Sequence, residues 1–155
     1  PGKAELVFRR AIRLREAIYW IFSRIASDKQ PASRDLDFLN SVISRMMVRM
    51  RVVPEKGGFG WKWMVEENSL DPLLWPIAKS AADLLTSDRL RSVRECAAED
   101  CGWLFLDRSA NQRRRWCDMK VCGNRAKARR HYQHSRKMTA RRTILQQDQP
   151  ASPKG

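Results

Sequence analysis

The 155-residue sequence predicts an α+β, mostly helical chain. We expect an N-terminal helical domain with a small β-hairpin, followed by a smaller cysteine-bearing domain that ends in a basic helix. Apolar residues recur at helical spacing through most of the first 92 residues, one stretch changes to strand alternation, and all four cysteines come after residue 95. The expected domains are therefore 1–92 and 93–142, with a disordered tail at 143–155.

The first two helices are expected over residues 4–27 and from about Ser33. In the first, one stripe of apolar side chains stands apart from the charged residues: Leu14, Ile18, Ile21, Phe22 and Ile25. Residues 28–31 end it, and Asp35 and Asp37 fall in the first turn of the second helix, where the helix dipole favours acids. Its buried face is expected at Leu36, Leu39, Val42, Ile43 and either Met46 or Met47.

Strands are expected at 49–53 and 59–65, joined through 54–58, which contains Pro54, Gly57 and Gly58. Four residues that alternate in the second strand are expected to share one sheet face: Phe59, Trp61, Trp63 and Val65.

A third helix is expected over 72–85, with Asp71 as its N-cap before Pro72. Its buried residues are expected to be Leu74 or Trp75, Ile77, Ala78, Ala81, Leu84 and Leu85. We interpret Trp61, Trp63 and Trp75 as packing this helix onto the hairpin, with a small-molecule pocket as the alternative. A further strand is expected over 90–96.

The charge is unevenly distributed along the chain. Lys and Arg number 31 against 17 Asp and Glu, which gives a net charge of +14 and a pI of about 10.5. Residues 1–107 carry 17 basic and 15 acidic side chains, whereas residues 108–155 carry 14 basic and 2 acidic ones. A surplus gathered in the last third indicates a polyanionic partner for that part of the chain.

Several protein classes are not expected. With 43% hydrophobic residues the composition is that of a globular protein, and no apolar stretch approaches the roughly 18 residues of a membrane span. The N-terminal residues lack the apolar core of a secretory signal, so export is not expected. The sequence also has no Gly-rich phosphate loop, no HExxH pattern and no nucleophile beside an evident base, so it does not indicate an enzyme.

The cysteines form a symmetric pair of pairs. Cys96 and Cys101 are separated by four residues, as are Cys117 and Cys122, with fifteen residues between the pairs. Such spacing brings four thiolates to one point, as tetrahedral zinc requires. The alternatives are two short-loop disulfides, which a reducing compartment disfavours, or four unrelated buried thiols. His131 and His134 are less favoured as competing ligands.

Around these cysteines the sequence predicts a treble-clef-like zinc finger. Residues 102–106 are expected to form a strand and 113–117 to return as its partner, with Asp107 and Ser109 fixing the turn between them. A helix is then expected from near Cys122 to about Met138. Its seam against the hairpin is expected at Val121, Ala128 and Tyr132.

Residues 108–142 hold 13 basic side chains and one acid. A one-signed field of this kind is usually a solvated face, but on a helix tied to a metal site it suits phosphate contacts and groove entry. The residues expected to bind nucleic acid are Arg113, Arg114, Arg115, Asn124, Arg125, Lys127, Arg129, Arg130, Arg136 and Lys137.

The segment from Cys96 to His131 contains CGWLFLD, RRWC and CGNRAK, and it resembles the CGNR zinc finger. The helices before it and the GWKWM stretch resemble the ABATE domain, which accompanies this finger in bacterial proteins and is described as a stress-induced transcription regulator. Such proteins usually have more residues ahead of the first helix seen here, so we expect the N-terminal domain to be incomplete.

The resemblance implies one structural zinc held by Cys96, Cys101, Cys117 and Cys122, a DNA-binding role, and a bacterial, cytoplasmic setting. Gly123, Asn124 and Arg125 complete its signature. Without a Cβ, Gly123 is expected to let backbone N–H groups approach the Cys122 thiolate. Asn124 either caps the helix or faces a base edge.

The leading hypothesis is a zinc-dependent transcription regulator that binds double-stranded DNA through the basic helix, while the N-terminal domain senses a signal or forms a homodimer. The alternatives are an RNA-binding accessory protein, or a protein-interaction module whose zinc is purely structural. Exposed Trp103, Phe105 and Trp116 would favour RNA, because they could form a stacking platform. No membrane partner is expected, and the effector is not identified.

Overall fold

The computed structural model describes residues 2–66 and 69–147, with side chains described as far as Arg136 and at Met138. The chain separates into two compact units: unit 1 comprises Pro1–Glu95 and Leu104–Arg113, and unit 2 comprises Cys96–Trp103 and Arg114–Gly155. We predicted one boundary, after residue 92. In the structure residues 96–103 belong to unit 2, residues 104–113 return to unit 1, and the chain from 114 onward belongs to unit 2 again.

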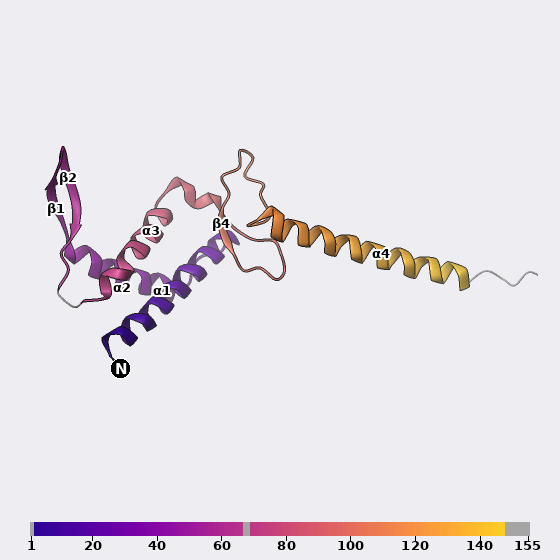
Figure 1. Ribbon diagram of the computed structural model, residues 1–155, viewed down its shortest axis with the longest axis horizontal. Coiled ribbons are helices and arrows are strands. Elements are labelled where there is room, and N and C mark those ends of the chain that lie inside the picture. Colours follow the sequence, from indigo (N-terminus) through magenta and orange to yellow (C-terminus); the bar gives the residue numbers. More distant parts are fainter. Residues whose placement is uncertain (1, 67–68, 148–155) are drawn as a thin grey trace, which may run out of the picture. The chain divides into compact units, whose positions relative to one another are not determined.

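Figure 1 shows the elements in chain order: α1 (Lys3–Ala26), α2 (Ser33–Arg49), β1 (Met50–Glu55), β2 (Gly58–Trp63), the 3-10 turn η1 (Asp71–Leu74), α3 (Trp75–Leu85), the 3-10 turn η2 (Asp88–Ser92), β3 (Val93–Glu95), β4 (Leu104–Leu106), the π-helical turn η3 (Met119–Gly123) and α4 (Asn124–Gln147).

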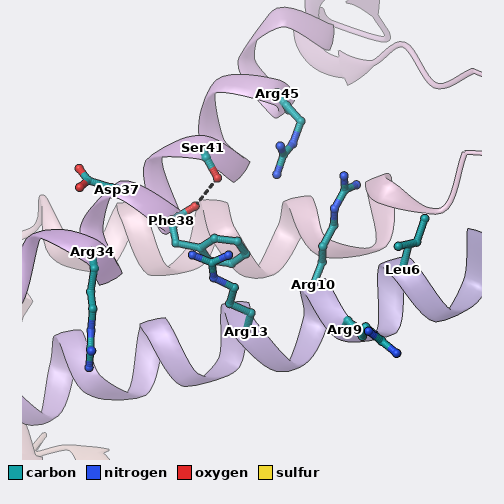
Figure 2. A pocket seen from close by; sticks show the side chains of 9 residues that line it. All are labelled: Leu6, Arg9, Arg10, Arg13, Arg34, Asp37, Phe38, Ser41 and Arg45. Atoms are coloured by element: carbon teal, nitrogen blue, oxygen red, sulfur yellow. Dashed lines mark hydrogen bonds between the residues drawn. The ribbon is translucent and has the colours of Figure 1, made fainter. Parts of the chain in front are cut away.

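Helix α1 lies within one residue of its predicted bounds, and α2 begins at Ser33 as predicted. Their apolar stripes meet in the core of unit 1, as expected, and the fully buried side chains there are Leu14, Ile21, Leu39 and Val42. Met46 is buried and Met47 exposed, which decides the alternative left open by the periodicity. At the edge of this interface the Arg13 guanidinium lies over the Phe38 ring, 4.2 Å from its centroid (Figure 2).

The β1–β2 hairpin forms with a tighter turn than predicted, because Pro54 and Glu55 still belong to β1 and pair with Phe59 and Gly58. Gly57 adopts φ +89°, a left-handed conformation that glycine tolerates without strain. The interpretation of the tryptophans was partly wrong. Trp63 packs edge-to-face against Trp75, with ring centroids 6.0 Å apart, but Trp61 is 65% exposed.

The third helix begins with the 3-10 turn η1, and Asp71 does not cap it. Its carboxylate instead accepts two hydrogen bonds from the Arg10 guanidinium of α1, at 2.7 and 3.0 Å. Trp75, Ala78 and Ala81 are buried as expected, but Ile77 is 53% exposed and was wrongly placed in the core.

The predicted strand pairing after residue 100 was wrong. Strand β4 pairs antiparallel with β3, and residues 113–117 are not a strand. The turn chemistry was right: Asp107 is buried, and its Oδ1 accepts hydrogen bonds from the backbone N–H and the hydroxyl of Ser109, at 3.0 and 2.6 Å. The further strand expected over 90–96 shrinks to the three residues of β3, because η2 takes up the chain before it.

In unit 2 the last helix follows a π-helical turn and runs past its predicted end to Gln147. Residues 143–147 are therefore helical rather than part of a tail, and the rest of the predicted tail, 148–155, lies outside the described residues. The predicted seam was also wrong, because Val121, Ala128 and Tyr132 are all exposed. No helix in the described part of the chain has both the length and the apolar character needed to cross a membrane.

Candidate metal centre

The four cysteines meet at one point in unit 2. Their Sγ atoms all lie within 4.8 Å of one another. Cys117 Sγ lies 3.7 Å from Cys101 Sγ and 3.6 Å from Cys122 Sγ. A tetrahedral zinc with Zn–S bonds of about 2.3 Å needs sulfurs about 3.8 Å apart. The cluster therefore fits one structural zinc ion, and all four thiols are free of disulfides.

Backbone hydrogen bonds bring the two cysteine pairs together. The Cys96 N–H donates to the Trp103 carbonyl at 2.9 Å, and the Cys101 N–H donates to the Ala98 carbonyl at 3.0 Å, which closes the first cysteine loop (97–100). The Ala97 N–H donates to the Arg115 carbonyl at 2.8 Å. The segment expected to be a strand thus pairs with the first cysteine loop and places Cys117 beside it.

The π-helical turn η3 carries Cys122. Asp118 caps this turn by accepting a hydrogen bond from the Val121 N–H at 2.8 Å, while Asn124, exposed, is the first residue of α4. The N–H of Gly123 itself donates to the Asp118 carbonyl at 3.1 Å. A Cβ at Gly123 would lie 2.5 Å from Met119 Sδ and 3.1 Å from Trp116 Cδ1, so the glycine makes room for these side chains.

The clustered thiols perturb one another. Burial, and then the neighbouring thiols of Cys122 and Cys96, raise the pKa of Cys117 to about 12. Burial likewise raises the pKa of Cys122. Burial also favours a higher pKa for the Cys96 thiol. Hydrogen bonds from the backbone N–H groups of Cys117 and Ala98 outweigh this effect, and the pKa of Cys96 is lowered to about 7. Four thiols this close ionise together only when a cation offsets their charge, which zinc would supply.

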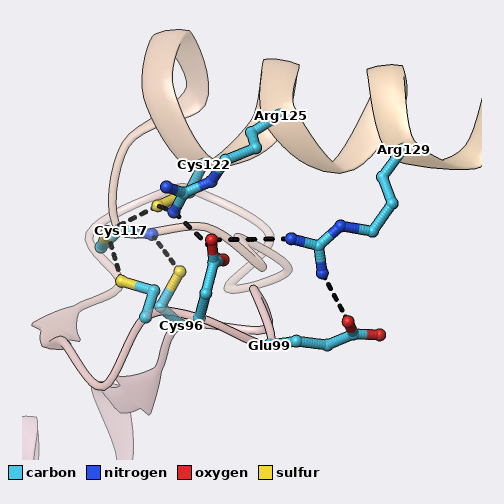
Figure 3. A network of polar contacts seen from close by, with 8 residues as sticks. Cys96, Glu99, Cys117, Cys122, Arg125 and Arg129 are labelled. Atoms are coloured by element: carbon cyan, nitrogen blue, oxygen red, sulfur yellow. Dashed lines mark hydrogen bonds and ion pairs between the residues drawn. The ribbon is translucent and has the colours of Figure 1, made fainter.

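Two arginines of α4 turn toward the first cysteine loop, and one of them, Arg125, also lies beside a thiol (Figure 3). Arg125 lies with its Nη2 atom 3.6 Å from Cys122 Sγ and 3.2 Å from an Asp100 carboxylate oxygen. One turn later, Arg129 pairs with Glu99 and lies 3.5 Å from Asp100. Ion pairs from the first cysteine loop therefore hold the start of α4, in addition to the clustering of the Cys122 thiol with the other three thiols.

Two arginines ahead of Cys117 also make contacts inside unit 2. The Arg114 guanidinium donates to the Trp116 carbonyl at 2.8 Å and to the Cys117 carbonyl. The Arg115 guanidinium lies 5.2 Å from the centroid of the Trp116 ring. These contacts support the chain that leads into the second cysteine pair.

The remaining residues expected to bind nucleic acid are exposed: Arg113, Asn124, Lys127, Arg130 and Arg136. Lys137 lies in α4, but its side chain is outside the described part of the structure. His131 and His134 are also exposed on α4 and do not belong to the metal-binding cluster.

Three residues of this site, Glu99, Asp100 and Asp118, were not predicted from the sequence. A signal for the first two was present, because they are adjacent acids inside a cysteine loop that precedes a strongly basic segment. Their partners could not be read from the sequence, because each ion pair joins residues about 25 to 30 positions apart.

Comparisons with known families agree with the geometry. Residues 92–135 match the family model of the CGNR zinc finger. Residues 1–88 match the ABATE family, whose description is "Putative stress-induced transcription regulator". The comparison with curated proteins found no match. The resemblance inferred from the motifs is therefore confirmed for both parts of the chain.

Proposed function

The chain belongs to the ABATE family, and on that premise we propose that it regulates transcription by binding duplex DNA through the zinc-bearing unit 2. The observation that carries the proposal is the outer surface of α4, where basic side chains are exposed and have no acidic neighbours on the helix. Such a surface suits phosphate contacts along a groove.

Ion pairs distinguish two of the basic residues of α4 from the others. Arg125 and Arg129 are engaged by the first cysteine loop. Lys127 follows Arg125 by two residues, which at 3.6 residues per turn puts it on the opposite side of the helix, whereas Arg130, five residues after Arg125, lies at the margin of the side that faces the first cysteine loop. We therefore assign the leading DNA contacts to Lys127 and Arg130, which form no ion pair with any described residue. Arg136 returns to the Arg125 side but lies about two turns beyond Arg129, and together with Lys137 it would extend the contact along the helix. Arg125 and Arg129 serve to position α4.

Zinc bound by the four cysteines would supply folding free energy to unit 2 and keep the start of α4 beside the first cysteine loop. Four thiolates fill its tetrahedral coordination and leave no position for a substrate. This donor set and the family both support a regulator rather than an enzyme.

RNA binding is the second candidate, and the exposure of Trp103 favours it. That side chain is 72% exposed and could stack on a base. The other two members of the expected stacking platform do not match it, because Phe105 and Trp116 are half-buried and Trp116 packs against the cysteines. Duplex DNA therefore remains the leading proposal.

The first experiment is selection of binding sites from a random duplex library with zinc-loaded protein at near-physiological salt. A discrete enriched motif would support sequence-specific regulation, and a palindromic motif would add a homodimer. If folded, zinc-loaded protein enriches no motif, the DNA proposal fails, and RNA binding or a purely structural zinc takes its place.

The helix faces are tested by the salt dependence of duplex binding. The double variant Lys127→Gln with Arg130→Gln should reduce the slope of log affinity against log salt by up to about 2, because each lost phosphate contact removes about 0.9. The control is Arg15→Gln with Arg89→Gln, which removes the same charge from exposed sites in unit 1. An equal loss of slope in both variants would contradict the assignment.

A further inference from the structure

A second concentration of basic side chains lies in unit 1, between α1 and α2. There a pocket of about 650 Å³ is open to solvent and lined by nine residues. Asp37 is the one carboxylate among them, and five are arginines: Arg9, Arg10, Arg13, Arg34 and Arg45. Residues 1–107 are almost balanced in charge, so composition does not explain this grouping.

Like charges on neighbouring helices repel one another, so their gathering in one pocket opposes folding unless an anion offsets it. Three of the arginines lie close to acids that offset part of their charge. Arg9 pairs with Glu5 at 2.8 Å, Arg10 pairs with Asp71 at 2.7 Å, and Arg34 lies 3.5 Å from Asp35. Among the residues that the structure describes, Arg13 and Arg45 form no ion pair. The uncompensated charge is therefore contributed by one arginine from each helix.

The pocket also has an ordered shape. Asp71 holds Arg10 with two hydrogen bonds, which fixes the direction of that guanidinium. The Arg13 guanidinium lies over the Phe38 ring, 4.2 Å from its centroid, and Arg13 is exposed to solvent. Figure 2 shows Arg10 reaching up from α1 and Arg45 down from α2 toward the same space. Guanidinium groups so arranged can bind an oxyanion with paired N–H donors.

We propose that this pocket binds a small organic anion that carries a phosphate or carboxylate group and a planar apolar group. Arg13 and Arg45 would bind the oxyanion, and the planar group would stack on the Arg13 guanidinium over Phe38. The pocket volume is within the range that holds small-molecule ligands. The proposal needs neither the zinc cluster nor DNA binding, so it stands or falls separately from the proposed function.

The test is calorimetric titration of the zinc-loaded full chain at low ionic strength with phenyl phosphate and with benzoate. We expect saturable binding of at least one of the two, and the tighter of them identifies the oxyanion. Arg13→Gln with Arg45→Gln should weaken binding by at least about tenfold, because charge-assisted hydrogen bonds are lost. Arg45→Gln alone should cause a smaller loss of affinity for the probe. This single variant replaces the double variant in the test if the double variant unfolds at a lower temperature than the unmodified chain.

The control is Arg15→Gln with Arg89→Gln, which lowers the net charge equally at exposed sites that do not line the pocket. It should bind the probe like the unmodified chain. The proposal is overturned if neither probe saturates, or if both double variants weaken binding equally, which would indicate general attraction to a basic protein. The proposal is also overturned if the double variant Arg13→Gln with Arg45→Gln weakens the binding of duplex DNA but leaves the affinity for the probe unchanged. The pocket would then be a DNA-binding surface.

Discussion

The two units differ in what holds them together. In unit 1, three helices and β3 bury one apolar cluster that includes Leu14, Ile21, Leu39 and Val42. In unit 2, the buried cluster consists of Cys96, Ala98 and Cys122, and ion pairs join α4 to the first cysteine loop. Unit 1 can thus derive its stability from apolar burial, whereas unit 2 depends on its metal. Unit 2 can therefore leave most of the described part of α4 exposed, because its fold does not need that surface.

Removing zinc should have the largest effect. Cys117→Ser, or chelation of the unmodified chain, should unfold unit 2 and leave α1–α3 folded, because structural zinc contributes about 10–16 kcal/mol to small thiolate sites. The measurements are zinc content and the residue-resolved NMR spectrum. Readdition of zinc should restore the chelated chain but not the variant. Tight stoichiometric zinc in Cys117→Ser would contradict the four-cysteine site.

The next largest effect is expected from a cavity in unit 1. Ile21→Ala removes a fully buried side chain and should lower the free energy of unfolding of unit 1 by about 2–5 kcal/mol, with zinc affinity unchanged. Denaturant unfolding and zinc competition measure the two quantities. Ile77→Ala is the matched control and should cost less than about 1 kcal/mol, because Ile77 is exposed. A loss of zinc affinity in Ile21→Ala would show that the units are not independent.

A smaller effect is expected beside the thiols. Arg125→Gln removes the cation near Cys122 Sγ and Asp100, and should weaken zinc binding by about tenfold, as is usual for residues that support metal ligands. Competition against a chromophoric chelator gives the affinity. Lys127→Gln lies on the opposite face and should leave it unchanged. If the two variants weaken zinc equally, Arg125 acts only through overall charge.

The smallest effect is the coupling between exposed charges. A double-mutant cycle on Arg129 and Glu99 should give about 0.2–1 kcal/mol, measured by thermal unfolding of zinc-loaded unit 2. The same cycle on Lys79 and Asp83 of α3 should give about 0.3–0.5 kcal/mol. A coupling of zero for Arg129 and Glu99 would show that this ion pair does not help to position α4.

Local patterns determined much of this protein. The apolar spacing in α1 and α2 was sufficient to predict both helices and most of their buried residues, because helical periodicity depends only on residues three or four positions apart. The cysteine spacing identified the metal site, and Gly57 and Gly58 identified the hairpin turn, because these signals also consist of residues close together in the sequence. Asp107 and Ser109 likewise form their predicted turn through contacts two residues apart.

The tertiary structure decided what depends on distant partners. Strand β4 could have paired with 113–117 or with β3, and three-residue strands carry too little pattern to choose between them. Trp61 and Trp63 are both tryptophans at alternate positions of β2, yet only Trp63 packs against Trp75, whereas Trp61 is exposed. The arginines of α4 look alike in sequence, and the acids Glu99 and Asp100 separate those that hold the helix from those left free to bind a partner.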